Sequence, residues 1–260
     1  MALEVDIRGM FVHYRTQGFI LKITDRGEAD QLLTVYTKDF GKLEILAKAV
    51  RKISSKLRPG TEIFNLSDIE FIQGKTHKTL TDAILIDKFE NIRKDLKKLR
   101  IAYKITDLLN NLVSSPEPDE KIWHLLLETF KNLNTEYKIR DAIYKIYYFF
   151  IWKLLAILGY TPELYNCVLC QKKLKPDKLF FSAREGGAIC NFCKKSVKST
   201  KEIKEINIET IKILRILLKG DWGTLARLKI KVKDLQFLKA VSDYFLSEIT
   251  SSLEKSLKKS

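Results

Sequence analysis

The sequence predicts an α+β fold in which a small β-barrel comes first and a helical domain follows. Two observations support this order: five β-rich runs end near residue 88, and apolar residues recur at helical spacing from about residue 91 onward. A third observation is that all the cysteines lie between Cys167 and Cys193, which predicts a small ribbon inserted into the helical part. The 260 residues are enough for two ordinary domains, which we place at 1–88 and 89–260.

The first domain is expected to be built from five short strands that are separated by glycines, charges and one Pro-Gly pair. Alternation is clearest in the third run, where Leu43, Ile45 and Ala47 share one face. Five strands with no long helix between them favour a five-stranded OB-fold barrel. An SH3-like barrel is the main alternative, since periodicity alone does not distinguish the two. The predicted strands lie in Gly18–Ile23, Gln31–Thr37, Gly41–Val50, Glu62–Gln73 and Leu80–Asp87.

The second domain is expected to be all-helical apart from the cysteine segment. Two prolines separate its first helix from its second, and Gly159 followed by Pro162 ends the third. The apolar stretch Ile146–Tyr160 is interrupted by Lys153 and is too short to span a bilayer, so we interpret it as a buried helix. The predicted helices lie in residues 90–113, 121–133, 139–160, 205–220 and 233–253.

All four cysteines belong to two CxxC pairs that are separated by nineteen residues. The N-terminus has no secretory signal pattern, so we expect a reducing cytoplasm, where paired CxxC motifs hold metal more often than they form disulfides. Two CxxC knuckles supply the tetrahedral thiolate set that zinc prefers, with no open position for catalysis. We therefore predict an inserted four-cysteine zinc ribbon at 165–197, with one structural Zn²⁺ bound by Cys167, Cys170, Cys190 and Cys193. An iron–sulfur cluster and a thiol or disulfide role are the alternatives.

The charge of the chain favours a polyanionic partner. The formal net charge is +15 and the isoelectric point is near 9.5. Residues 1–90 are almost neutral, with 14 Lys or Arg against 13 Asp or Glu, while the remainder carries 33 against 19. This balance is typical of proteins that bind nucleic acid, although it does not identify one.

The basic residues form clusters, although a single lysine is more often only part of a solvated face. Lys48–Arg58 holds five basic residues and no acid, in the loop expected after the third strand, where it could follow a phosphate backbone. Arg93–Arg100 is expected to form a basic ridge on one helix, and further lysines surround the cysteines. The predicted DNA-binding residues are Lys48, Arg51, Lys52, Lys56, Arg58, Arg93, Lys97 and Arg100.

The aromatic residues of the barrel could have either of two roles. They could stack on bases, or they could form the core, which is the commoner place for aromatic residues in a small barrel. These residues are Phe19, Tyr36, Phe40, Phe64 and Phe71.

No constellation of residues supports catalysis. The histidines His13, His77 and His124 lack a second ligand at metal-binding spacing, and the chain has no phosphate-binding glycine loop or nucleophile elbow. We therefore expect a protein that is not an enzyme.

Taken in order, these segments resemble the RecO family of bacterial DNA repair proteins, and in particular its zinc-bearing members. The acidic turn at Glu28 and Asp30 and the strand-and-loop stretch Gly18–Gly60 carry the N-terminal resemblance. The most specific piece is Ile157–Cys170, ILGYTPELYNCVLC. The chain departs from the family pattern at Val50, where a glycine or another small residue is usual.

The resemblance implies a recombination mediator with an N-terminal OB-fold. Such a protein would bind single- and double-stranded DNA and anneal complementary strands. It would act with RecR and with the single-stranded-DNA-binding protein, help to load RecA, and work in the bacterial cytoplasm at the nucleoid. Two alternatives fit the same residues: an RNA-binding OB-fold module, and a non-catalytic interaction scaffold.

Overall fold

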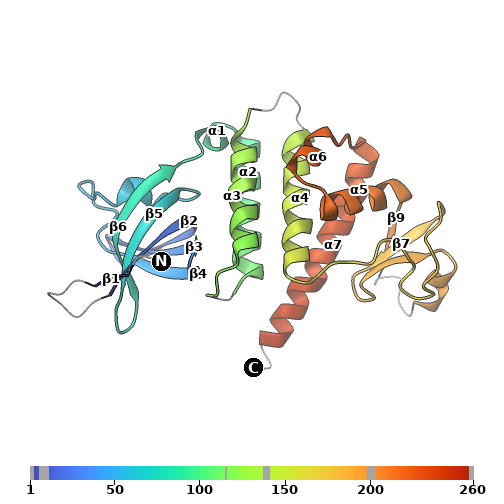
Figure 1. Cartoon of the computed structure of the whole chain (residues 1–260), viewed down its shortest axis with the longest axis horizontal. Helices are drawn as coiled ribbons and strands as arrows, with labels where there is room; N and C mark the ends of the chain where they lie inside the picture. The colour runs from blue at the N-terminus through green and yellow to red at the C-terminus, as the bar shows by residue number, and fades with distance from the viewer. Residues whose placement is uncertain (1–2, 6–11, 115, 137–140, 198–202, 258–260) are drawn as a thin grey trace. The chain divides into compact units, whose positions relative to one another are not determined.

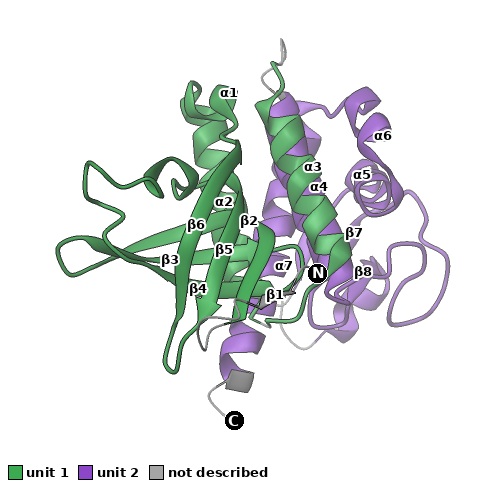
Figure 2. Ribbon diagram, turned by 60° about the vertical axis from the view of Figure 1, so that its left-hand side comes forward, with its two compact units in different colours: residues 1–138 green, residues 139–260 purple. Residues whose placement is uncertain are grey.

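The computed structural model describes residues 3–5, 12–114, 116–136, 141–197 and 203–257. The chain forms two compact units, Met1–Lys138 and Ile139–Ser260, which Figure 2 shows in different colours. The boundary that the sequence suggests at 88/89 stays a prediction.

The first unit contains a closed β-barrel. Its strands are β2 (Val12–Arg26), β3 (Asp30–Thr37), β4 (Gly41–Ala47), β5 (Leu66–Gln73) and β6 (Lys78–Asp87). They follow the order β2-β3-β4-β6-β5, and β5 pairs back with β2 to close the barrel. All of these pairings are antiparallel except β4 with β6. This strand order is that of an OB-fold, so the predicted fold is confirmed over the SH3-like alternative. A short additional strand, β1 (Leu3–Val5), pairs with β2.

The interior of the barrel is filled by alternating side chains. Leu43, Ile45 and Ala47 on β4 are buried, as the alternation in the sequence predicts, and pack with Leu33 and Ile69. Four of the five aromatic residues that could have stacked on bases are buried in the core. The base-stacking interpretation is therefore wrong for Phe19, Tyr36, Phe64 and Phe71.

Three helices complete the first unit: α1 (Glu90–Arg93), α2 (Leu96–Leu112) and α3 (Glu120–Asn134). They lie beside the barrel in Figure 1. The ring of Phe19 on β2 contacts Trp123 and Phe130 on α3 at centroid distances of 5.6 and 5.3 Å. The hydroxyl of Tyr36 donates to the carbonyl of Asp119 at 3.4 Å, and burial raises the pKa of Tyr36 to about 12. The barrel and these helices therefore share one apolar core.

The helix predicted over residues 90–113 is in fact two helices. Asp95 lies between them in an extended conformation, and its carboxylate accepts hydrogen bonds from the backbone N–H groups of Lys97 and Lys98. These two bonds satisfy the first free donors of α2 and start a new helix at Leu96. The prediction of a single helix is wrong because the apolar periodicity continues across a cap.

The second unit is a helical bundle that carries the ribbon. Its helices are α4 (Asp141–Ile157), α5 (Ile208–Lys219), α6 (Trp222–Arg227) and α7 (Val232–Leu257), and α4 contacts the other three. The indole N–H of Trp152 on α4 donates to the hydroxyl of Ser242 on α7 at 3.0 Å, and both residues are buried. This confirms α4 as a buried helix. No helix of the described residues combines the length and the apolar character that crossing a bilayer requires.

The ribbon is a three-stranded sheet in the order β8-β7-β9. Its hairpin is formed by β7 (Leu179–Ser182) and β8 (Gly187–Cys190), as predicted. The strand β9 (Lys204–Ile206) was not expected, because it lies in a segment predicted to be helical. The helix α5 starts only after Asn207, whose side chain accepts from the N–H of Thr210 at 2.7 Å.

Candidate metal centre and nucleic-acid interface

The four cysteines form one cluster at the end of the ribbon. Their sulfur atoms all lie within 4.8 Å of one another, so they could hold a metal ion. The Sγ atoms of Cys170 and Cys190 are 3.9 Å apart, far longer than a disulfide bond, and all four thiols are free. Cys167 and Cys193 are buried, whereas Cys170 and Cys190 are partly exposed. The folded chain therefore brings together the ligand set predicted from the spacing.

The polar groups around the cluster favour a thiolate at Cys167. Burial alone would raise the pKa of Cys167, but backbone N–H groups of Cys190, Cys170 and Leu169 donate to its sulfur and lower the pKa to about 7. Burial and hydrogen bonds with the three other thiols raise the pKa of Cys193 instead. Four thiolates cannot crowd together without a cation, so the donor set fits an ion that prefers tetrahedral sulfur ligands.

The predicted basic loop follows β4 and is attached to the barrel at its first residues. The N–H of Ala49 donates to the carboxylate of Asp30 at 2.7 Å, and the N–H of Arg51 donates to the carbonyl of Ala29 at 3.0 Å. Ala49 adopts a positive φ of 53° at this turn. Val50, which departs from the family pattern, is buried in the barrel core. The loop is thus held to the β2–β3 turn.

The basic side chains of this loop are all exposed. Arg51 lies 3.5 Å from the carboxylate of Asp25, and the other four have no ion pair among the residues that the structure describes. The exposed set is Lys48, Arg51, Lys52, Lys56 and Arg58. Arg51 and Arg58 also line a pocket of about 420 Å³ at the base of the loop. The loop therefore presents uncompensated positive charge to solvent.

The second predicted cluster does not form one ridge. Arg93 lies on α1, whereas Lys97 and Arg100 are exposed on α2, beyond the cap at Asp95. The guanidinium of Arg93 donates to the carbonyl of Ile63 at 2.6 Å and to the side chain of buried Asn65 at 2.8 Å. Arg93 thus holds the segment before β5 against α1.

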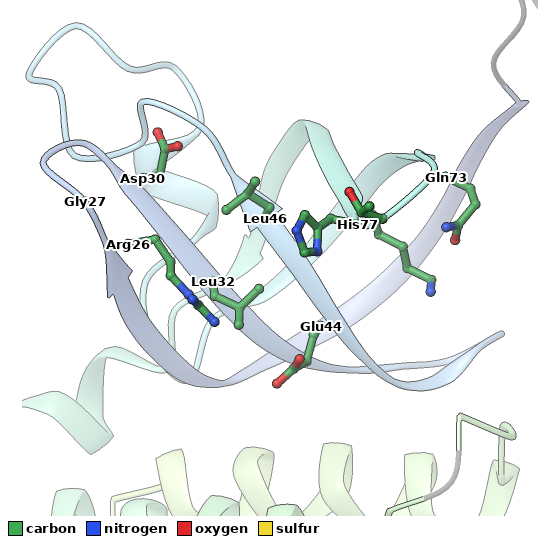
Figure 3. A pocket seen from close by; sticks show the side chains of 10 residues that line it. Arg26, Gly27, Asp30, Leu32, Glu44, Leu46, Gln73 and His77 are labelled. Carbon is green, nitrogen blue, oxygen red and sulfur yellow. The ribbon is translucent and has the colours of Figure 1, made fainter.

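A groove that the charge pattern did not reveal lies on the face of β3 and β4. It has a volume of about 530 Å³, and Figure 3 shows its lining side chains. They come from the β2–β3 turn, from the two strands and from the β5–β6 hairpin. OB-folds bind oligonucleotides with this strand face and with these two loops. The lining residues are Arg26, Gly27, Asp30, Leu32, Glu44, Leu46, Gln73, Thr76, His77 and Lys78.

The groove adjoins the basic loop through Asp30. This residue lines the groove and also accepts the hydrogen bond from Ala49 at the start of the loop. Arg26, His77 and Lys78 were missed because they come from two separate segments, and Lys75–Lys78 is too short to show as a basic cluster. The predicted strand order could have identified them, since it shows which loops flank the β3–β4 face.

Comparison with known proteins gives two family matches that together cover most of the chain. The families described as "Recombination protein O N terminal" and "Recombination protein O C terminal" match residues 10–89 and 93–260. A DNA repair protein RecO of Dehalococcoides mccartyi is 32% identical over 219 residues, which cover 84% of this chain and 83% of the relative. The RecO protein of a Thermoanaerobacter species is 31% identical and covers 83% and 84%. That of Desulfitobacterium hafniense is 27% identical and covers 94% and 87%.

Proposed function

Because the chain belongs to the RecO family of DNA repair proteins, we propose that it binds single- and double-stranded DNA and anneals complementary strands. The observation that carries this proposal is the groove on the β3–β4 face, which adjoins an exposed basic loop. The groove has the dimensions of a ligand site, and it lies where OB-folds bind oligonucleotides.

The groove is suited to a single strand. Leu32 and Leu46 offer apolar surface to bases and sugars, while Arg26 and Lys78 offer cations to phosphates. Asp30 and Glu44 add acceptors for the exocyclic amines of bases. The core aromatics take no part, so contact with bases in the groove is made by aliphatic and polar groups.

Annealing requires more than binding one strand, because two phosphate backbones repel each other. The basic loop is suited to reduce this repulsion. Its five exposed cations belong to a loop whose start adjoins the groove, and they release counterions when they meet phosphates. Lys97 and Arg100 extend the basic surface along α2. For Arg93 we propose a positioning role, because its donors already bind Ile63 and Asn65.

The metal centre is proposed to be a single structural zinc. Cys167, Cys170, Cys190 and Cys193 would hold it, and the bound ion would supply the charge that lets four thiolates stay together. The site has four protein ligands and no position for a substrate. We further propose that the protein is not an enzyme.

The partners proposed for this chain come from its family. They are RecR and the single-stranded-DNA-binding protein, with RecA loaded indirectly, and the place of action is the bacterial nucleoid in the cytoplasm. The support for this part is family membership and the positive charge of the chain.

Strand annealing tests the proposal directly. Complementary oligonucleotides, one pair naked and one coated with single-stranded-DNA-binding protein, are followed by fluorescence quenching with and without this protein. Acceleration of both reactions, lost at high salt, is the expected result. Tight binding without acceleration would contradict the annealing role. Competition with RNA of matched sequence then tells whether the barrel prefers RNA.

A further inference from the structure

The two metal-binding knuckles of the ribbon present the same short pattern to solvent. The first reads CVLCQKK and the second CNFCKK, so each has an apolar residue before its second cysteine and a lysine pair after it. The apolar residues are Leu169, which is 38% exposed, and Phe192, which is 88% exposed. The lysine pairs are exposed as well. Two similar surfaces therefore flank one four-sulfur cluster.

The exposure of Phe192 is not a result of loose packing nearby. Phe180 and Phe181 on β7 are buried, and the amino group of Lys194 lies 4.4 Å from the centre of the Phe180 ring. Cys193, the residue after Phe192, is also buried. The backbone of the second knuckle thus holds the Phe192 ring outward while the next residue, Cys193, points inward. The Phe192 ring is therefore available to a ligand and offers it a flat apolar face.

The charge around this ring is positive. Residues 165–197 contain seven Lys or Arg and two Asp or Glu. A Zn²⁺ ion with four thiolates carries a formal charge of −2, which still leaves the ribbon positive. Lys172, Lys173 and Lys195 have no ion pair among the residues that the structure describes. An exposed ring and free cations on the knuckles of one sulfur cluster suit the bases and phosphates of a single strand.

We propose that the ribbon tip, defined as Leu169, Lys172, Lys173, Phe192 and Lys195, is a second binding site for single-stranded DNA. Phe192 stacks on an unpaired base, and the three lysines contact the phosphates on either side of it. This inference rests on the proposed annealing function. Annealing involves two strands, and in this proposal the barrel binds one strand and the ribbon tip binds the other. Because every base has a π-face, the ribbon tip accepts any sequence.

Photo-crosslinking of the full-length, zinc-loaded protein tests this site. The probe is a single-stranded oligonucleotide that carries 5-iododeoxyuridine, and mass spectrometry locates the crosslink. We expect a crosslink at Phe192 that remains when Lys48, Lys52 and Lys56 are replaced by Ala in the barrel loop. A crosslink confined to the barrel would overturn the proposal.

Substitutions at one position separate stacking from general apolar contact. In the barrel-loop triple variant, Phe192→Ala should weaken single-strand binding about 5- to 150-fold, which corresponds to one stacked base. Phe192→Trp keeps an aromatic ring and should bind single-stranded DNA as tightly as the protein with Phe192. Phe192→Leu should bind as weakly as Phe192→Ala. Val232→Ala removes another exposed apolar side chain of the same unit, 70% exposed, and should have no effect. Zinc content and circular dichroism show that each variant is folded.

The outcomes distinguish this inference from the proposed function. If Phe192→Ala anneals and binds as the parent does, the ribbon site is wrong and the barrel function stands. If Phe192→Leu binds single-stranded DNA as the parent does and the crosslink is absent, Phe192 does not stack on a base and the ribbon site is wrong. If the barrel-loop variant keeps full affinity and annealing while Phe192→Ala loses both, the barrel proposal fails and the ribbon proposal holds.

Discussion

The carboxylate of Asp30 accepts a hydrogen bond of 2.7 Å from the backbone N–H of Ala49 and thereby joins the β2–β3 turn to the start of the basic loop. One residue thus lines the groove and also positions the loop beside it. The turn that holds Asp30 therefore supports a basic surface, and the Asp30 carboxylate is engaged by a backbone N–H group.

Asp30→Ala should lower the free energy of unfolding by about 1–3 kcal/mol, because it leaves the Ala49 donor without its charged acceptor. Asp30→Asn keeps a carbonyl oxygen at the same place and should lose less. Urea denaturation of both variants measures the difference. Equal losses in the two variants would show that the charge, and not the hydrogen bond, is what matters.

Replacement of Lys48, Lys52 and Lys56 by Ala should weaken binding to single-stranded DNA and flatten its salt dependence. If each lysine contacts one phosphate, the slope of log affinity against log salt should fall by about 2. The matched control replaces Lys88, Lys94 and Lys131, which lie close to the carboxylates of Glu90 and Glu128. Fluorescence anisotropy at several salt concentrations gives the slopes. Identical slopes for the two triple variants would remove the loop from the DNA site.

Arg93→Ala and Arg100→Ala should have opposite signatures. Loss of Arg93 leaves the buried side chain of Asn65 without a charged donor, so unfolding should become easier by about 1.5–3 kcal/mol. Loss of exposed Arg100 should leave stability unchanged and reduce DNA affinity. Thermal denaturation and DNA titration of both variants measure this. A stable Arg93→Ala protein with weak DNA binding would show instead that Arg93 contacts DNA, as the sequence predicted.

Cys167→Ser should lose the metal and lower the melting temperature of the second unit, because a structural zinc contributes folding free energy. Ser196→Ala, at an exposed position beside the last ligand, is the control and should keep both. Zinc content per chain and a thermal melt are measured on the same samples. A fully folded, metal-free Cys167→Ser protein would contradict a structural role for the ion.

Acid should destabilise the barrel through Glu70. The imidazole of His13 donates to its carboxylate at 2.7 Å and the hydroxyl of Thr81 at 2.9 Å, and these bonds, the His13 bond foremost, hold the pKa of Glu70 below its usual 4.5. A depressed folded-state pKa means that the stabilisation is complete above pH 4.5 and is lost as the pH falls through the folded value. Urea midpoints of the parent and of Glu70→Gln should therefore differ at pH 7 and converge at acid pH. A constant difference would exclude this linkage.

Local signals in the sequence predicted most of the fold. Strand alternation placed Leu43, Ile45 and Ala47 in the core, and the cysteine spacing predicted the sulfur cluster, since both patterns depend on neighbouring residues. The cap at Asp95 was missed because apolar periodicity runs through it. The strand β9 was missed because three residues are too few to show a period.

The site was harder to predict than the fold. The basic loop was visible because its charges lie close together in the sequence, whereas Arg26 and Lys78 come to line one groove only when β2, β3, β4 and β6 pair in that order. Arg93 has the charge of a DNA ligand, but its contacts with Ile63 and Asn65 depend on packing between segments far apart in the chain. Charge density therefore predicts where phosphate can bind, but it does not predict the groove.

The pairing of β2 with β5 also sets an order of events during synthesis. The barrel closes only when His13–Phe19 meets Leu66–Ile72, so the N-terminal strand leaves the ribosome long before its second partner. Closure therefore depends on a non-local contact, which makes barrel formation slow compared with the hairpin of β2 and β3. A nascent chain whose synthesis stops within the basic loop would present an unpaired sheet edge together with the positive charge of the loop. Such a chain would be prone to aggregation.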